Sequence, residues 1–179
     1  MASDEDQDDP LTDVGSGEGS DDNGLDRATP KASHEQSLTD GQHVAVRLLA
    51  GREHARDELI RKLHQRGWSE SQCETILDRL MALGLQSDER FAESFVRSRV
   101  QKAFGPVRIR AELQQRGIDR ELIEQALRSD TPDWLAVAAG WYERRYGTEP
   151  IEDVKERGRR QAALARRGFT SDIIRELID

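Results

Sequence analysis

Cysteine is almost absent from this sequence, and its scarcity limits the chemistry open to the chain. The one cysteine, Cys73, cannot form an intramolecular disulfide, and we expect it to be a buried thiol in a reducing compartment. Because no pair of cysteines or histidines has metal-ligand spacing, the sequence argues against a structural zinc site. The four histidines form no catalytic arrangement. We therefore expect neither a metal nor a cofactor.

Long apolar runs are also lacking. The longest, Trp134 to Tyr142, is about half of the roughly 20 residues that a membrane-spanning helix needs. The opening residues, MASDEDQDDP, lack the basic and apolar stretch of a secretion signal. These absences predict a cytoplasmic protein that does not bind membranes.

The residue patterns of catalytic sites are missing as well. No nucleophile with a neighbouring base and no metal-binding cluster can be recognised. The run GSGEGS at residues 15–20 superficially resembles a phosphate-binding loop, but no strand is predicted before it and no helix after it. We therefore expect no catalytic residues and predict that the protein is not an enzyme.

The acidic charge of the chain is concentrated near its start. Residues 1–40 hold twelve Asp and Glu against Arg27 and Lys31, whereas the formal net charge of the whole chain is −8. Such a segment buries too little apolar surface to offset its conformational entropy, so it is predicted to be disordered. Two interpretations stay open: a solubilising extension, or an acidic arm that folds onto a basic face and competes with an anionic partner.

The rest of the chain has helical periodicity and repeats itself. The pattern L-x-x-R-G followed by an apolar residue occurs three times, with the glycines 50 and 51 residues apart, at Leu63–Trp68, Leu113–Ile118 and Leu164–Phe169. Each copy fits a helix that ends in a left-handed glycine cap, followed by a capped new helix. With one further helix ahead of each copy, the spacing predicts a tandem array.

The predicted fold is therefore all-α. It consists of three tandem three-helix units in an elongated curved array, preceded by the disordered acidic tail. The predicted boundaries are residues 1–40 for the tail, 42–84 for the first unit, 85–129 for the second and 130–179 for the third.

A basic cluster lies in the second unit, where Val96 to Ala111 contains no acidic residue and five basic ones: Arg97, Arg99, Lys102, Arg108 and Arg110. A positive field inside an acidic protein suggests a binding face. Helical phase predicts that Arg97 points to water and is free to bind, whereas Arg99 lies over the core and pairs with a carboxylate. Arg108 and Arg110 should flank Ile109 on opposite sides.

Cations gather on the second helix of each unit, while the third helices are rich in acids. The third unit has no acidic residue between Arg157 and Ser171. A helix-turn-helix would bring the acidic helix to the DNA, so sequence-specific reading of DNA is disfavoured. Binding to a nucleic-acid backbone stays open. No aromatic residue clearly projects from the basic faces, so stacking on single strands has little support.

The motifs FAESFVRSR and GPVRIRAELQQRGI resemble the central signature of the RecX family of bacterial recombination regulators. The first unit, with REHARDEL and GLQSDERFA, is similar to the family's opening pattern, and RRGFTSDIIRELI fits its weaker final pattern. The resemblance covers residues 42–179. It implies a monomeric, non-enzymatic regulator that binds the groove of a RecA filament on single-stranded DNA. There it would restrain ATP hydrolysis, strand exchange and filament growth, and so act in recombination, DNA repair and the SOS response.

The basic cluster and the resemblance together give the candidate contact residues. The full set is Arg97, Arg99, Lys102, Arg108, Arg110 and Arg116, followed by Arg157, Arg159, Arg160, Arg166 and Arg167 of the third unit. Which of them would touch RecA and which single-stranded DNA stays open. The alternative function is a general nucleic-acid backbone binder that uses the basic second helices.

Overall fold

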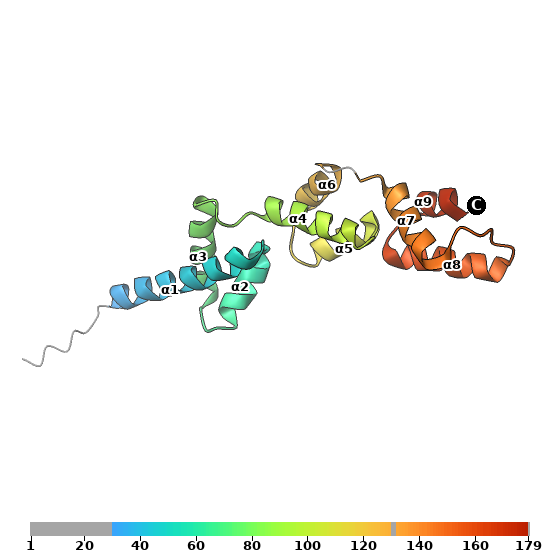
Figure 1. The fold of residues 1–179 in the computed structure, drawn as a ribbon. Coiled ribbons are helices and arrows are strands. Elements are labelled where there is room, and N and C mark those ends of the chain that lie inside the picture. Colours follow the sequence, from blue (N-terminus) through green and yellow to red (C-terminus); the bar gives the residue numbers. More distant parts are fainter. Residues whose placement is uncertain (1–29, 130–131, 179) are drawn as a thin grey trace, which may run out of the picture.

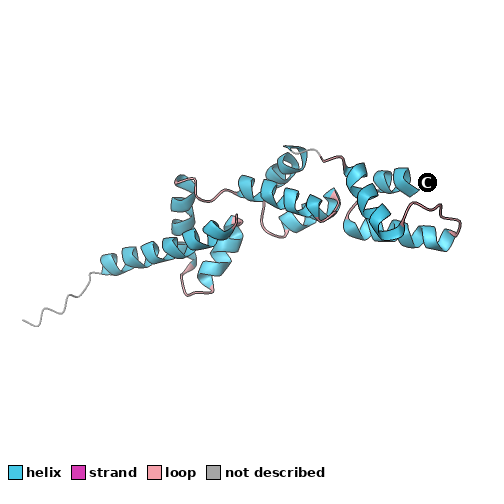
Figure 2. Cartoon of the chain, in the orientation of Figure 1, coloured by secondary structure: helices cyan, strands magenta, loops and turns pink. Residues whose placement is uncertain are grey.

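The fold is described for residues 30–129 and 132–178 in a computed structural model (Figure 1). These residues form nine helices and contain no strand (Figure 2). The helices are α1 (Pro30–Gly51), α2 (Arg56–His64), α3 (Glu70–Ala82), α4 (Asp88–Gln101), α5 (Pro106–Gln114), α6 (Arg120–Ser129), α7 (Trp134–Tyr146), α8 (Val154–Arg167) and α9 (Ser171–Ile178).

The helices form three successive units of three, and each unit has a hydrophobic core of its own. Unit 1 comprises α1 to α3 and packs around residues such as Leu59, Leu63 and Ile76. Unit 2 comprises α4 to α6, and unit 3 comprises α7 to α9. The units follow one another along an elongated molecule (Figure 1). This arrangement confirms the predicted all-α class and its three tandem three-helix units.

The repeated turn has the backbone geometry that its sequence predicts. Gly67, Gly117 and Gly168 have φ angles of 103°, 79° and 90°, in the left-handed region that favours glycine. After each glycine, the N–H of the apolar residue donates to the carbonyl of the repeat's leucine, with N–O distances of 3.2 to 3.4 Å. Each turn therefore closes its helix and directs the next one back over the same core.

Helix α1 begins earlier than the sequence predicted. Part of the expected disordered tail, residues 30–40, is helical, so that part of the prediction is wrong. Leu38 is buried in the unit 1 core, and the Trp68 indole N–H donates to the Ser37 carbonyl at 2.9 Å. Arg79 pairs with Glu35 at 2.8 Å. Tertiary contacts thus order a stretch that has one large apolar residue; residues 1–29 lie outside the described chain.

Units 1 and 2 are joined by a small polar network at the start of α4. The Asp88 carboxylate accepts hydrogen bonds from the Arg56 backbone N–H and from the Gln86 amide, both at 2.8 Å. The same amide reaches the His54 carbonyl at 3.3 Å, and both Gln86 and His54 are buried. The network therefore holds the start of α2 against the start of α4.

Units 2 and 3 are joined backbone to backbone. The Gly105 N–H donates to the Arg167 carbonyl at 2.8 Å, and the Val107 N–H donates to the Gly168 carbonyl at 3.0 Å. A side chain at Gly105 would collide with the Gly168 backbone. The Arg167 guanidinium adds hydrogen bonds to the carbonyls of residues 102 and 103, at 2.8 and 2.9 Å. The two units therefore meet in one defined orientation.

Candidate functional site

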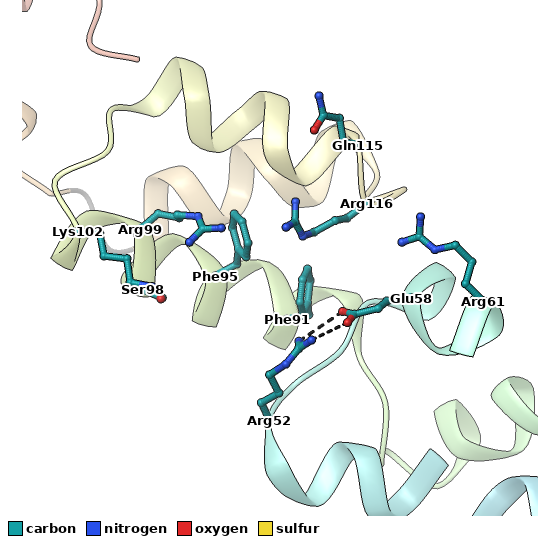
Figure 3. A pocket seen from close by; sticks show the side chains of 10 residues that line it. All are labelled: Arg52, Glu58, Arg61, Phe91, Phe95, Ser98, Arg99, Lys102, Gln115 and Arg116. Atoms are coloured by element: carbon teal, nitrogen blue, oxygen red, sulfur yellow. Dashed lines mark hydrogen bonds and ion pairs between the residues drawn. The ribbon is translucent and has the colours of Figure 1, made fainter. Parts of the chain in front are cut away.

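A cavity of about 620 Å³ lies between units 1 and 2 and is strongly basic (Figure 3). We call it the basic cavity. Its lining contains five cationic side chains and one carboxylate. The lining residues are Arg52, Glu58 and Arg61 of unit 1, and Phe91, Phe95, Ser98, Arg99, Lys102, Gln115 and Arg116 of unit 2.

Phe95 occupies the middle of the unit 2 wall. The Arg99 and Arg116 guanidinium carbons lie 4.5 and 4.7 Å from the centre of its ring, and the ring lies between the two side chains in Figure 3. Phe91, one helical turn earlier, packs against Phe95 with 5.8 Å between ring centres. An aromatic residue does reach the basic face, but arginines cover the Phe95 ring, so stacking of a nucleic-acid base there stays without support.

Arginine–aromatic contacts continue from the cavity into unit 3. The Phe104 ring has Arg108 at 4.3 Å and Arg167 at 5.1 Å, and Arg99 lies 5.8 Å from it. Arg167 also lies 4.5 Å from the Trp141 ring. We call this chain the arginine–aromatic row; its members are Arg116, Phe95, Arg99, Phe104, Arg108, Arg167 and Trp141. Each such contact contributes about 0.5–2 kcal/mol and fixes the position of a guanidinium.

Glu112 organises the unit 2 part of the row. Its two carboxylate oxygens accept hydrogen bonds from Arg99 at 2.6 Å and Arg108 at 2.9 Å, and its backbone carbonyl accepts one from Arg116 at 2.7 Å. Burial raises the pKa of Glu112, but the hydrogen bonds from Arg108 and Arg99 outweigh burial and lower the pKa overall. The Glu112 carboxylate therefore positions Arg99 of α4 and Arg108 of α5, and the Glu112 backbone carbonyl positions Arg116 in the turn after α5.

The lowered pKa of Glu112 makes a prediction about acid stability. A carboxylate with a lowered pKa stabilises the fold above its unfolded pKa of about 4.3, and this stabilisation is lost as the pH falls through the folded pKa. We expect Glu112→Gln to lower the free energy of unfolding at neutral pH by about 1–3 kcal/mol. Urea unfolding followed over pH should show the two proteins converging in acid; a gap that stays constant down to the lowest pH would contradict this role.

The sequence-predicted residues divide between the row and other surfaces. Arg99, Arg108, Arg116 and Arg167 belong to the row, and Lys102 lines the basic cavity. The candidates outside both are Arg97, Arg110, Arg157, Arg159, Arg160 and Arg166.

The two arginines at the end of α4 differ as their helical phase predicted. Arg99 pairs with the Glu112 carboxylate and has a side chain that is 22% exposed, so that prediction is confirmed. Arg97 is exposed, as expected, but it forms an ion pair with Glu93 at 3.9 Å. The exposure of Arg97 is therefore confirmed, and its role in binding stays a prediction. Arg97 lines a separate hollow with residues such as Val100 and Pro132.

Arg108 and Arg110 point to different neighbours, as their flanking of Ile109 predicted. Arg110 donates two hydrogen bonds to the Glu124 carboxylate, at 2.6 and 3.2 Å. These bonds lower the pKa of Glu124. Arg110 thus ties α5 to α6 within unit 2, away from the row.

Most of the unit 3 candidates have structural partners on their own unit. Arg159 and Arg160 both pair with Glu156 at 2.7 Å, and Arg160 donates to the Tyr142 hydroxyl at 2.9 Å. Arg157 donates to the Ile151 carbonyl at 3.3 Å. The acid-free run that starts at Arg157 is therefore partly neutralised, because Glu156, the residue just before it, pairs with two of its arginines.

Sequence reasoning left Arg52 and Arg61 out of the candidate site. Arg52 pairs with Glu58 at 2.5 Å beside the cavity. Arg61 has no ion-pair partner among the described residues. The exposure of Arg61 could have been predicted from the sequence. Arg61 lies between the buried Leu59 and Leu63 on α2, so helical periodicity turns it away from the core.

The predicted absences can be compared with the described part of the chain. Within residues 30–129 and 132–178, no group of three or more His, Cys, Asp and Glu side chains is arranged to hold a metal ion. None of the helices described there combines the length and apolar character needed to cross a membrane. Cys73 is buried, as expected, and burial raises the pKa of its thiol.

Comparison with protein families finds three adjacent matches. They are the RecX first three-helix domain at residues 43–80, the RecX second three-helix domain at residues 87–127 and the RecX third three-helix domain at residues 132–178. The second and third matches correspond closely to units 2 and 3, and the first covers unit 1 from residue 43 of α1 onward.

Individual proteins give the same result. The chain is 43% identical over 137 residues to the regulatory protein RecX of Pseudomonas entomophila (strain L48), covering 76% of this chain and 88% of that protein. It is 47% identical over 132 residues to that of Halorhodospira halophila (strain DSM 244 / SL1), covering 74% and 82%. The crystal structure of RecX from Lactobacillus salivarius is similar, with a TM-score of 0.68, 25% identity and coverage of 80% of this chain and 96% of that one.

Proposed function

Because the chain belongs to the RecX family of regulatory proteins, we propose that it binds a RecA filament on single-stranded DNA and restrains its ATP hydrolysis, strand exchange and growth. Its relatives are named regulatory proteins, and the proposed role of the chain is likewise that of a regulator rather than an enzyme. The observation that carries the proposal is the arginine–aromatic row, which runs from unit 2 into unit 3 beside the basic cavity.

An elongated array of small units suits a repeating helical partner. Each unit can contact a different part of the filament, so several modest charged contacts add up without a deep pocket. The junctions at Asp88 and at Gly105 orient the units before binding. Pre-orientation reduces the entropy lost on binding, which favours affinity.

Regulation follows if the bound protein prefers one state of the filament. A ligand shifts an equilibrium only by the difference in its affinity for the two states. A protein that contacts adjacent subunits would stabilise the spacing that its own units match. Slower ATP hydrolysis and slower growth are then consequences of holding the filament in that spacing.

The contacts of each cation suggest a division of roles. We assign direct contact to Arg61, Lys102 and Arg116, since none of them forms an ion pair with a carboxylate among the described residues. Arg99 and Arg108 are assigned to positioning, because Glu112 holds both. Direct contact with DNA phosphates as well as with protein is part of the proposal, as is a monomer acting in the bacterial cytoplasm.

Binding measurements can test the proposal against the general nucleic-acid binder. We expect the protein to bind RecA filaments on a fluorescent oligothymidylate more tightly than the same strand alone, with the preference retained as salt is raised. Contacts to phosphate alone weaken steeply with salt. Equal affinity for the bare strand and the filament, with a steep loss in salt for both, would favour the alternative.

A further inference from the structure

The chain carries opposite charges in two separate places. Residues 1–29 contain ten Asp and Glu and one basic residue, Arg27. The basic cavity has five cationic side chains and one carboxylate in its lining. A carboxylate-rich segment and a cationic cavity in one molecule are chemically complementary.

The cavity offers charges that the protein does not neutralise itself. Arg61 and Lys102 line it, and neither side chain forms an ion pair among the described residues. The Arg116 guanidinium contacts the Glu112 carbonyl and the Phe95 ring, neither of which carries a full negative charge. Carboxylates from elsewhere could therefore form charge-assisted hydrogen bonds here.

The other arginine-rich surface is a weaker candidate. On α8, Arg159 and Arg160 already pair with Glu156. Unit 3 also lies at the end of the molecule opposite to the start of α1 (Figure 1). The basic cavity lies nearer than unit 3 to the start of α1, and fewer of its cations are paired with carboxylates (Figure 1).

The connection is long enough. Helix α1 has 22 residues, so about 33 Å separate its start at Pro30 from Gly51, the residue before Arg52 of the cavity. The 21 residue steps from Asp9 to Pro30 can span at most about 75 Å. The densest acidic stretch, Asp4 to Asp9, can therefore pass back along α1 and reach the cavity with slack.

We propose that the acidic residues of segment 4–26 bind the basic cavity of the same chain and compete there with anionic groups of a partner. The competition rests on the proposed function, whereas the intramolecular contact does not. The segment acts as a built-in competitor whose strength falls with salt, because screening shortens from about 10 Å at 0.1 M to about 3 Å at 1 M.

Even a weak contact has a measurable effect because it is intramolecular. With an effective concentration on the order of 1 mM, a contact with a dissociation constant near 0.1 mM lowers the affinity for a competing anion by about tenfold. The affinity of a partner at low salt should therefore report on the acidic segment.

Paramagnetic relaxation tests the contact directly in the full-length chain. A spin label is attached to a Ser3→Cys variant; the native Cys73 is buried with a raised thiol pKa, so it reacts poorly. At low salt we expect the label to broaden the amide signals of Ser98, Lys102 and Arg116 while the signals of α9 stay sharp. At high salt the broadening should disappear.

A charge-reversed cavity provides the matched control. Arg61→Glu with Lys102→Glu should abolish the broadening, whereas Arg120→Glu with Arg175→Glu makes the same change of net charge on exposed residues elsewhere and should leave it intact. The proposed contact would be contradicted if the parent chain showed no broadening at low salt. It would also be contradicted if both double variants lost the broadening equally.

A second measurement separates the contact from its consequence. In the full-length chain, the ten acidic residues are changed to their amides: Asp4, Glu5, Asp6, Asp8, Asp9, Asp13, Glu18, Asp21, Asp22 and Asp26. We expect the affinity for an oligothymidylate-bound RecA filament to rise about tenfold at low salt, and little at high salt. An unchanged affinity at low salt would overturn the competition, even where relaxation shows the contact. Failure of the parent chain to bind the filament would count against the proposed function alone.

Discussion

Replacing Arg116 and Lys102 together with alanine is expected to weaken binding to the RecA filament about 30-fold. Neither cation is paired with a carboxylate among the described residues, and both line the basic cavity. Loss of two charged contacts of about 1 kcal/mol each corresponds to that factor, since 1.4 kcal/mol is tenfold. The affinity is measured by fluorescence anisotropy of filaments assembled on a labelled strand.

A matched control uses two sequence-predicted cations outside the row. Arg97→Ala with Arg166→Ala removes the same charge from exposed positions and should change the affinity by less than about threefold. Thermal melting should show that both double variants are folded. If the control weakens binding as much as the test variant, net charge rather than the cavity governs binding.

Substitution of Gly105 by alanine is expected to separate units 2 and 3. Gly105 has φ −86° and ψ 166°, a conformation open to alanine, so backbone strain plays no part. The added methyl would instead meet the Gly168 carbonyl, which is backbone and cannot rotate away. Such overpacking costs about 1–3 kcal/mol. Hydrogen exchange of the Gly105 and Val107 amides, which both donate across the junction, should accelerate about 30-fold.

The corresponding control is Gly158→Ala. Gly158 lies inside α8, and a methyl group there would meet open space. We expect this change to leave the junction amides unaffected and to stabilise unit 3 by about 0.5–1 kcal/mol through helix propensity. Because Arg167 binds across the same junction, Gly105→Ala should also weaken filament binding. Unchanged exchange at Val107 in Gly105→Ala would show that the junction tolerates a side chain.

The repeated architecture was predictable because its determinants are local. A left-handed glycine and the apolar residue after it define the turn three times over, and periodic apolar residues define the buried faces. The start of α1 was missed for the opposite reason. Leu38 is buried in the unit 1 core, and Glu35 pairs with Arg79 of α3. These contacts join residues far apart in sequence, so local periodicity does not predict them.

The site was only partly predictable, because charge runs do not show how charges are neutralised. Helical phase predicted the pairing of Arg99, and the spacing of Arg108 and Glu112 would have allowed their pairing to be predicted. Arg167 reaches across to unit 2 and lies over the Phe104 ring, although the two residues are more than sixty positions apart in sequence. This contact depends on how units 2 and 3 meet, which the sequence pattern does not show. The exposure of Arg61 could be predicted from its place between Leu59 and Leu63, but its position beside unit 2 also depends on how the units meet.

The most direct test of the proposed regulation is ATP hydrolysis by RecA on saturating single-stranded DNA, at moderate salt, with this protein well below one copy per RecA monomer. We expect the hydrolysis rate to fall, because each bound copy would act on the filament rather than on free DNA. So little protein could not act by sequestering the excess DNA. An unchanged rate at every ratio, together with binding to the bare strand, would contradict filament regulation and leave a general nucleic-acid binder.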